Sequence, residues 1–149
     1  MQAQMLAPAA VLVVWTLIVM FWIIPARFGA IAKVTDKSTL PQKAGMRGAD
    51  LEGLIPDKAN WPAHNHTHLH EQPTLFYATA LILAVAGPAA LDVALAWIYV
   101  GLRVLHSLWQ ILVNTIPVRF ALFLASSLAL IVLAVRAVTA TVFADPTAI

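Results

Sequence analysis

Four long apolar stretches constrain the fold of this chain more than any other feature of its sequence. They predict helices at about 6–32, 64–86, 92–113 and 117–143, and a helix needs about 20 apolar residues to cross a bilayer. Lipid offers no hydrogen bonds to a backbone, so such segments must satisfy their own polar groups as helices. The sequence therefore predicts an all-α integral membrane protein, with one domain over residues 1–149 built as a bundle of four transmembrane helices.

The composition supports a membrane protein and excludes several other classes. Hydrophobic residues make up 61% of the chain and charged residues 11%, whereas a soluble domain of this length needs far more charge on its surface. The net charge of +2 is too small to indicate a nucleic-acid partner. The chain has no cysteine, which excludes disulfides, thiolate metal sites and a cysteine nucleophile. The first apolar run is too long for a signal-peptide core, so we expect it to be retained.

The distribution of lysine and arginine predicts how the helices are oriented. The long connection at about 34–62 and the connection before the last helix hold most of these residues. Cytoplasmic loops of membrane proteins carry an excess of lysine and arginine, so we place both connections in the cytoplasm. Arg136 lies near the far end of the last helix, and we expect its long side chain to reach the opposite interface.

One face of the expected third helix carries a stripe of polar residues, spaced i, i+3, i+7 and i+11: Arg103, His106, Gln110 and Asn114. Charged groups inside a membrane are costly and usually face the interior of a bundle. Glu71 starts the second helix at a similar depth, so we expect it to form an ion pair with Arg103. This pair either only joins two helices or belongs to a functional site. His106 likewise either makes an interhelical hydrogen bond or binds a ligand.

The segment HNHTHLHE at the start of the second helix has two interpretations. It contains two histidine pairs four residues apart, His64 with His68 and His66 with His70, and this spacing on a helix can clamp zinc or copper. Glu71 would add a third ligand. Alternate histidines, however, point to different faces of a helix, and histidines at a membrane surface are also ordinary weakly basic residues. We expect no metal site, and a metal-binding tract stays an alternative.

Three short motifs at matching distances resemble the MAPEG family, the membrane-associated proteins in eicosanoid and glutathione metabolism. The motifs are E-x-P, R-x-x-H-S and P-x-R-F, which begin at Glu71, Arg103 and Pro117. The resemblance covers most of the chain and is closest to bacterial members. It implies a homotrimer of four-helix subunits in the bacterial inner membrane, with glutathione bound between adjacent subunits in the cytoplasmic half. Members of known activity are glutathione transferases, peroxidases or isomerases that act on lipophilic electrophiles.

The resemblance also implies which residues hold glutathione. Arg119, at the start of the last helix, is the expected catalytic residue, because its family counterpart lies near the glutathione sulfur. The expected glutathione-binding residues come from the first three helices: Arg27, His64, His68, Glu71, Arg103 and His106.

The chain departs from the family pattern at several positions around this site. His64 and His68 stand where relatives have an arginine and an asparagine, Phe120 replaces a hydroxyl residue, and Phe123 and Gln110 replace tyrosines. A neutral imidazole pairs with the carboxylates of glutathione less well than a planar guanidinium does. Arg119 is therefore the main group left to stabilise a thiolate, which requires a nearby cation or hydrogen-bond donor.

Three functions are compatible with these observations. The leading one is a glutathione-dependent transferase or peroxidase for lipophilic electrophiles, with membrane lipid and further copies of the chain as partners. The second is a non-catalytic protein of the same fold that binds a lipid or quinone-like molecule, or serves as an accessory subunit of a larger membrane complex. The third is a metal-binding protein that uses the histidines between His64 and His70.

Overall fold

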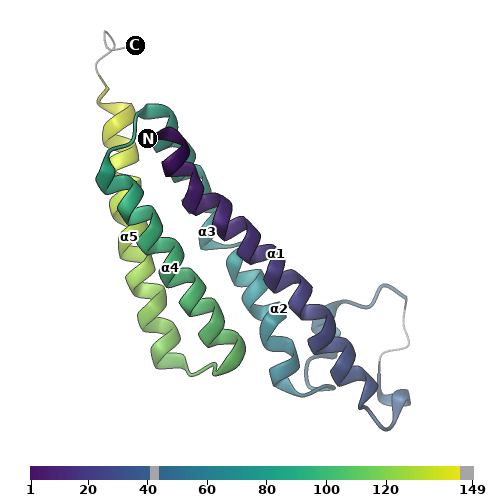
Figure 1. The fold of residues 1–149 in the computed structure, drawn as a ribbon. Coiled ribbons are helices and arrows are strands. Elements are labelled where there is room, and N and C mark those ends of the chain that lie inside the picture. Colours follow the sequence, from purple (N-terminus) through teal and green to yellow (C-terminus); the bar gives the residue numbers. More distant parts are fainter. Residues whose placement is uncertain (41–43, 145–149) are drawn as a thin grey trace.

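The computed structural model describes residues 1–40 and 44–144, and this part of the chain is built from helices and the loops between them. Figure 1 shows two groups: α1 runs beside α2 and α3, and α4 and α5 form a hairpin. The elements in chain order are α1 (Gln2–Ala32), the short 3₁₀ helices η1 (Lys37–Thr39) and η2 (Gly48–Leu51), α2 (Asp57–Leu69), α3 (Gln72–Ala86), α4 (Ala90–Leu112) and α5 (Ile116–Val142).

Three of the described helices are long and apolar enough to cross a membrane: α1 with 31 residues, α4 with 23 and α5 with 27. Large apolar side chains along these helices lie on the outside of the subunit, among them Phe21, Leu105 and Ile131. An apolar outer surface of this extent suits lipid as the surrounding solvent. The prediction of an all-α membrane bundle is confirmed.

The second helix of the bundle is interrupted, which differs from the single helix expected at about 64–86. It begins earlier, at Asp57, and breaks between Leu69 and Gln72 into α2 and α3. Glu71 has φ −85° and ψ −97°, outside the helical region, and Pro73 occupies the first turn of α3. Proline suits the start of a helix, because its missing N–H is not needed there. The chain therefore ends one helix at the histidine tract and begins another immediately after it.

A chain of buried polar side chains joins the two groups of helices. Ser107 of α4 donates a hydrogen bond to Asn65 of α2 and accepts one from the indole of Trp15 of α1 at 2.9 Å. Asn65 also donates to the side-chain oxygen of Gln110 at 2.9 Å. Every member of this network has a partner in the protein, as the apolar surroundings require.

An ion pair joins α4 and α5 at the end of the hairpin far from the turn that connects them. Asp92, in the first turn of α4, accepts hydrogen bonds from the guanidinium of Arg136 on α5 and from the backbone N–H of Ala89 at 2.8 Å. Asp92 is buried, so its carboxylate needs these partners. Arg136 thus has an anionic partner on the neighbouring helix, which the sequence analysis did not predict, and its position relative to the membrane interface stays a prediction.

Replacing Asn65 with alanine tests the buried network. We expect Asn65→Ala to lower the free energy of unfolding by about 1–2 kcal/mol, because Ser107 and Gln110 lose their partner inside the bundle. The measurement is denaturation of the detergent-solubilised protein by titration with SDS. Thr67→Ala is the matched control, since Thr67 is exposed on the same helix and bonds only the carbonyl of Ala63. Equal losses in the two variants would contradict a structural role for the network.

Candidate functional site

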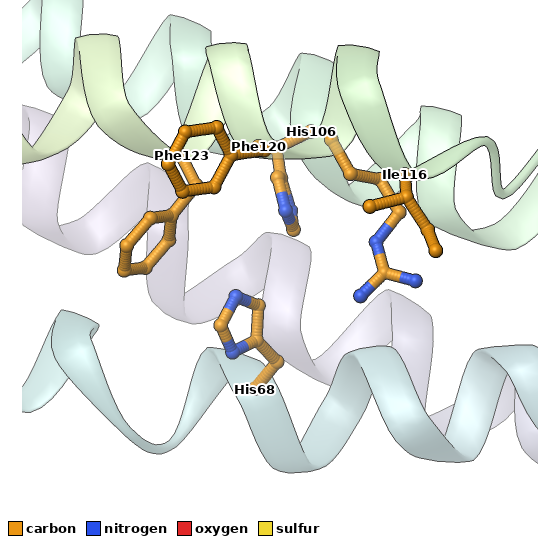
Figure 2. Close-up of a pocket in the computed structure, with 6 residues that line it drawn as sticks. His68, His106, Ile116, Phe120 and Phe123 are labelled. Carbon is orange, nitrogen blue, oxygen red and sulfur yellow. The ribbon is translucent and has the colours of Figure 1, made fainter.

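A cavity of about 210 Å³ opens between α2, α4 and α5. Figure 2 shows His68 extending from α2 across this cavity toward His106 of α4, with the rings of Phe120 and Phe123 beside them. The cavity is smaller than the roughly 300–1,000 Å³ of most ligand pockets. It is lined by His68, His106, Ile116, Arg119, Phe120 and Phe123. Three of the residues predicted for the site, one from each helix, therefore meet here.

The turn between α4 and α5 positions Arg119. Asn114 has φ 62°, a left-handed conformation that asparagine adopts more readily than most residues, and its N–H donates to the carbonyl of Trp109 at 2.7 Å. Its side-chain oxygen accepts a hydrogen bond from Nη1 of Arg119 at 2.6 Å. The same residue thus ends one helix and orients the arginine at the start of the next. The Nε of Arg119 is buried and has no partner among the described residues.

Arg103 is held by aromatic rings and not by a carboxylate. Its guanidinium carbon lies 5.6 Å from the centre of the Tyr99 ring and 5.3 Å from that of Phe123, and its Nε donates to the Tyr99 hydroxyl at 3.2 Å. Cation–π contacts of this kind stabilise a cation that water cannot reach. The side chain is only 1% exposed, and its Nη2 has no hydrogen-bond partner within residues 1–40 and 44–144. Tyr99 was missed by the sequence analysis, although its place one turn before Arg103 is a usable signal.

The expected ion pair between Glu71 and Arg103 is wrong for this subunit. The carboxylate of Glu71 lies 2.8 Å from Nδ1 of His68, and its side chain is 62% exposed. The prediction assumed a continuous helix through Glu71, whereas the backbone at this residue is not helical and separates α2 from α3. Glu71 therefore belongs to the rim of the cavity, beside the histidine that lines it.

The stripe on α4 is confirmed for its first three members. Arg103, His106 and Gln110 are 1%, 3% and 4% exposed, so one face of α4 carries polar groups into the bundle. Asn114 lies beyond the end of the helix at Leu112, and its role is the turn described above.

Besides Glu71 and Arg103, two further predicted site residues lie outside the lining of this cavity. Arg27, near the end of α1, donates from Nε to the side chain of Asn60 at 3.1 Å. His64 lies 2.9 Å from the carboxylate of Glu52 in the long connection. Both therefore tie α2 to neighbouring segments in the subunit, and their predicted contact with glutathione stays a prediction.

The remaining histidines of the tract interact with each other. The rings of His66 and His70 are 4.5 Å apart, and Nδ1 of His70 lies 2.8 Å from the carbonyl oxygen of His66. Partial burial, together with the nearby His70, holds the pKa of His66 below its ordinary value. In the part of the chain that the structure describes, no three His, Asp or Glu side chains lie close enough together to hold a metal ion.

Two substitutions at Asn114 separate its backbone role from its contact with Arg119. Asn114→Gly and Asn114→Ala both remove the oxygen that holds Arg119, but only glycine adopts the left-handed conformation without a steric cost. We expect the alanine variant to unfold more easily than the glycine variant by about 1–2 kcal/mol. SDS titration of both proteins measures the difference, and equal stabilities would show that the turn relaxes to another conformation.

Comparison with known protein families agrees with the motifs found in the sequence. A sequence model of the MAPEG family matches residues 5–139, a range that contains α2, α3 and α4 and most of α1 and α5. All the residues that line the cavity fall inside it. Neither the comparison with curated proteins nor the comparison with solved structures gave a match. Because the family match covers most of the sequence, the chain belongs to the MAPEG family and is a multi-pass membrane protein.

Proposed function

We propose that this protein is a glutathione-dependent transferase or peroxidase that acts on lipophilic electrophiles, and that the cavity between α2, α4 and α5 binds the thiol end of glutathione. Membership of the MAPEG family supports the reaction class. Arg119 supports the location, because it lines this cavity and carries a buried Nε without a partner among the described residues.

The buried Nε of Arg119, which has no partner among the described residues, is the observation that carries the proposal. Burying a donor without an acceptor is costly, so a site with such a group favours an anion that completes its hydrogen bonds. A thiol becomes a nucleophile when it loses its proton, and a neighbouring cation stabilises the thiolate that forms. Asn114 leaves Nε free because it takes its hydrogen bond from Nη1. Arg119 can therefore face the sulfur of glutathione while the turn holds its other nitrogen.

Arg103 and the aromatic wall support the same proposal. The guanidinium of Arg103 lies behind Phe123 and also has a buried nitrogen without a partner in the described segments. Phe120, Phe123 and Ile116 give the cavity an apolar side, which suits a lipophilic second substrate. The residues present thus fit a ligand with an anionic and an apolar end.

The homotrimer is part of this proposal. One subunit encloses about 210 Å³, which is less than a tripeptide-sized ligand usually occupies in a pocket. We infer that a neighbouring copy covers the open side and supplies further contacts to the carboxylates of glutathione. The proposed site then lies in the cytoplasmic half of the bacterial inner membrane, with the long connection between α1 and α2 on the cytoplasmic side.

Titration of the purified protein with glutathione in detergent tests the function. We expect binding at millimolar glutathione or below, together with the ultraviolet absorbance of a thiolate. Arg119→Ala should lower the thiolate fraction at neutral pH about tenfold, because the bound sulfur loses its nearest cation. Arg119→Lys should keep part of this fraction, since lysine retains the charge without the fork of donors.

Lys33→Met is the matched control for loss of a positive charge, because Lys33 is exposed at the end of α1. It should leave binding and thiolate formation unchanged. Absence of glutathione binding by the wild-type protein would sink the proposal and favour a non-catalytic, lipid-binding or accessory protein of the same fold. Copurification with a larger membrane complex would point to the accessory role.

A further inference from the structure

The contact between His68 and Glu71 has no role in the function proposed so far. Nδ1 of His68 lies 2.8 Å from a carboxylate oxygen of Glu71, and the His68 ring lines the cavity. The two residues are three apart, and the contact spans the end of α2 and the non-helical residue Glu71 before α3. The His68 side chain is 25% exposed, intermediate between the buried His106 and the exposed carboxylate.

This contact fixes which nitrogen of His68 carries the proton in the neutral ring. An ionised carboxylate only accepts hydrogen bonds, so Nδ1 of His68 must donate and Nε2 keeps its lone pair. Figure 2 shows the His68 ring directed across the cavity toward His106. Among the described residues, Glu71 is the only hydrogen-bond partner of this ring. A carboxylate that holds a histidine in this way also stabilises the ring once it becomes positively charged.

The groups that face His68 come from three segments. Phe123 of α5 stacks on its ring at 5.6 Å, and His106 of α4 lies 5.1 Å away, both measured between ring centres. Arg119 lines the same cavity, and Glu71 is the only anion in contact with the ring among the described residues. Of the two histidines, His106 is buried and has no carboxylate in contact with its ring among the described residues. Only His68 has a carboxylate placed to stabilise a positively charged ring.

We propose that His68 is the catalytic base that takes the proton of the glutathione thiol, and that Glu71 is the residue that positions it. The proposal rests on the proposed function, since it assigns a further residue to the same site. Arginine stays protonated in proteins, so Arg119 stabilises the thiolate and cannot accept the proton that the thiol must lose. A separate base is therefore needed, and Nε2 of His68 is the nitrogen available to serve.

The proposed reaction adds glutathione to an α,β-unsaturated carbonyl compound, and it conserves protons and electrons. Nε2 of His68 takes the thiol proton, and Glu71 stabilises the imidazolium that results. The new carbon–sulfur bond forms with the electron pair left on sulfur, and the π electrons of the carbon–carbon double bond move toward the carbonyl oxygen. His68 then returns its proton to the α-carbon as the carbonyl reforms. The ring is neutral again, and no other reactant is consumed.

Counting protons during glutathione binding tests this assignment without an electrophile. Calorimetry of the full-length protein in two buffers of different ionisation enthalpy measures proton release, and absorbance measures the thiolate in the same samples. We expect the wild-type protein to form thiolate with no net release, because the proton moves from sulfur to His68. His68→Gln should still bind glutathione but form less thiolate, and its kcat should fall about 100-fold, a larger change than any change in KM for glutathione.

Two further variants test the positioning role of Glu71 and control for the loss of a histidine. Glu71→Gln changes an exposed side chain and should shift thiolate formation in the same direction by a smaller amount. His70→Gln is the matched control, because His70 is exposed and its Nδ1 contacts only a carbonyl of its own helix. It should leave thiolate formation, proton release and kcat unchanged.

The outcomes distinguish the two proposals. A wild-type protein that forms thiolate while releasing a full proton to the buffer would overturn the role of His68 and leave the proposed function standing. The same conclusion would follow if His68→Gln formed as much thiolate as the wild type. If the wild-type protein bound no glutathione at all, both proposals would fall together.

Discussion

Every polar group inside this bundle must find its partner within the protein, because lipid offers none. The rest of the structure follows from this constraint. Asn65, Ser107, Trp15 and Gln110 satisfy one another across three helices, and Asp92 and Arg136 satisfy each other at one end of the hairpin. Against this background, an unpaired buried donor is a signal of function. The described residues contain two, on Arg103 and Arg119, and both guanidinium groups lie at or behind the same cavity.

The break between α2 and α3 decides which groups surround that cavity. A continuous helix would carry Glu71 on the face it shares with His68 and toward Arg103. The interrupted backbone instead leaves the carboxylate on the rim, beside the ring of His68. The cation of Arg103 is then held between two aromatic rings, and the carboxylate is free to act on a histidine. The change in backbone direction at Glu71 thus separates its carboxylate from the guanidinium of Arg103. The carboxylate contacts His68, and the guanidinium contacts aromatic rings.

The sequence predicts the fold well, because apolar length and helical periodicity are local properties. The membrane class, the buried face of α4 around Arg103 and His106, and the family all follow from short patterns in the chain. The site is predicted less completely. The partners of Glu71 and Arg27 depend on a break in a helix and on the fold of a connection, and residue spacing on an ideal helix contains neither. The connection at Asn114 was predicted, but its left-handed conformation and its hydrogen bond to Arg119 were not.

The number of residues in the link between α4 and α5 determines where the guanidinium of Arg119 lies. Asn114 and Arg119 are five residues apart, and the hydrogen bond between them spans the turn and the first turn of α5. One residue inserted before Arg119 within that first turn would rotate the arginine by about 100° around the helix axis. The guanidinium would then leave the cavity while the apolar character of α5 stayed the same. A chain with a longer or shorter link at this point would need a different cation at the cavity, even where its helices are equally good membrane spans.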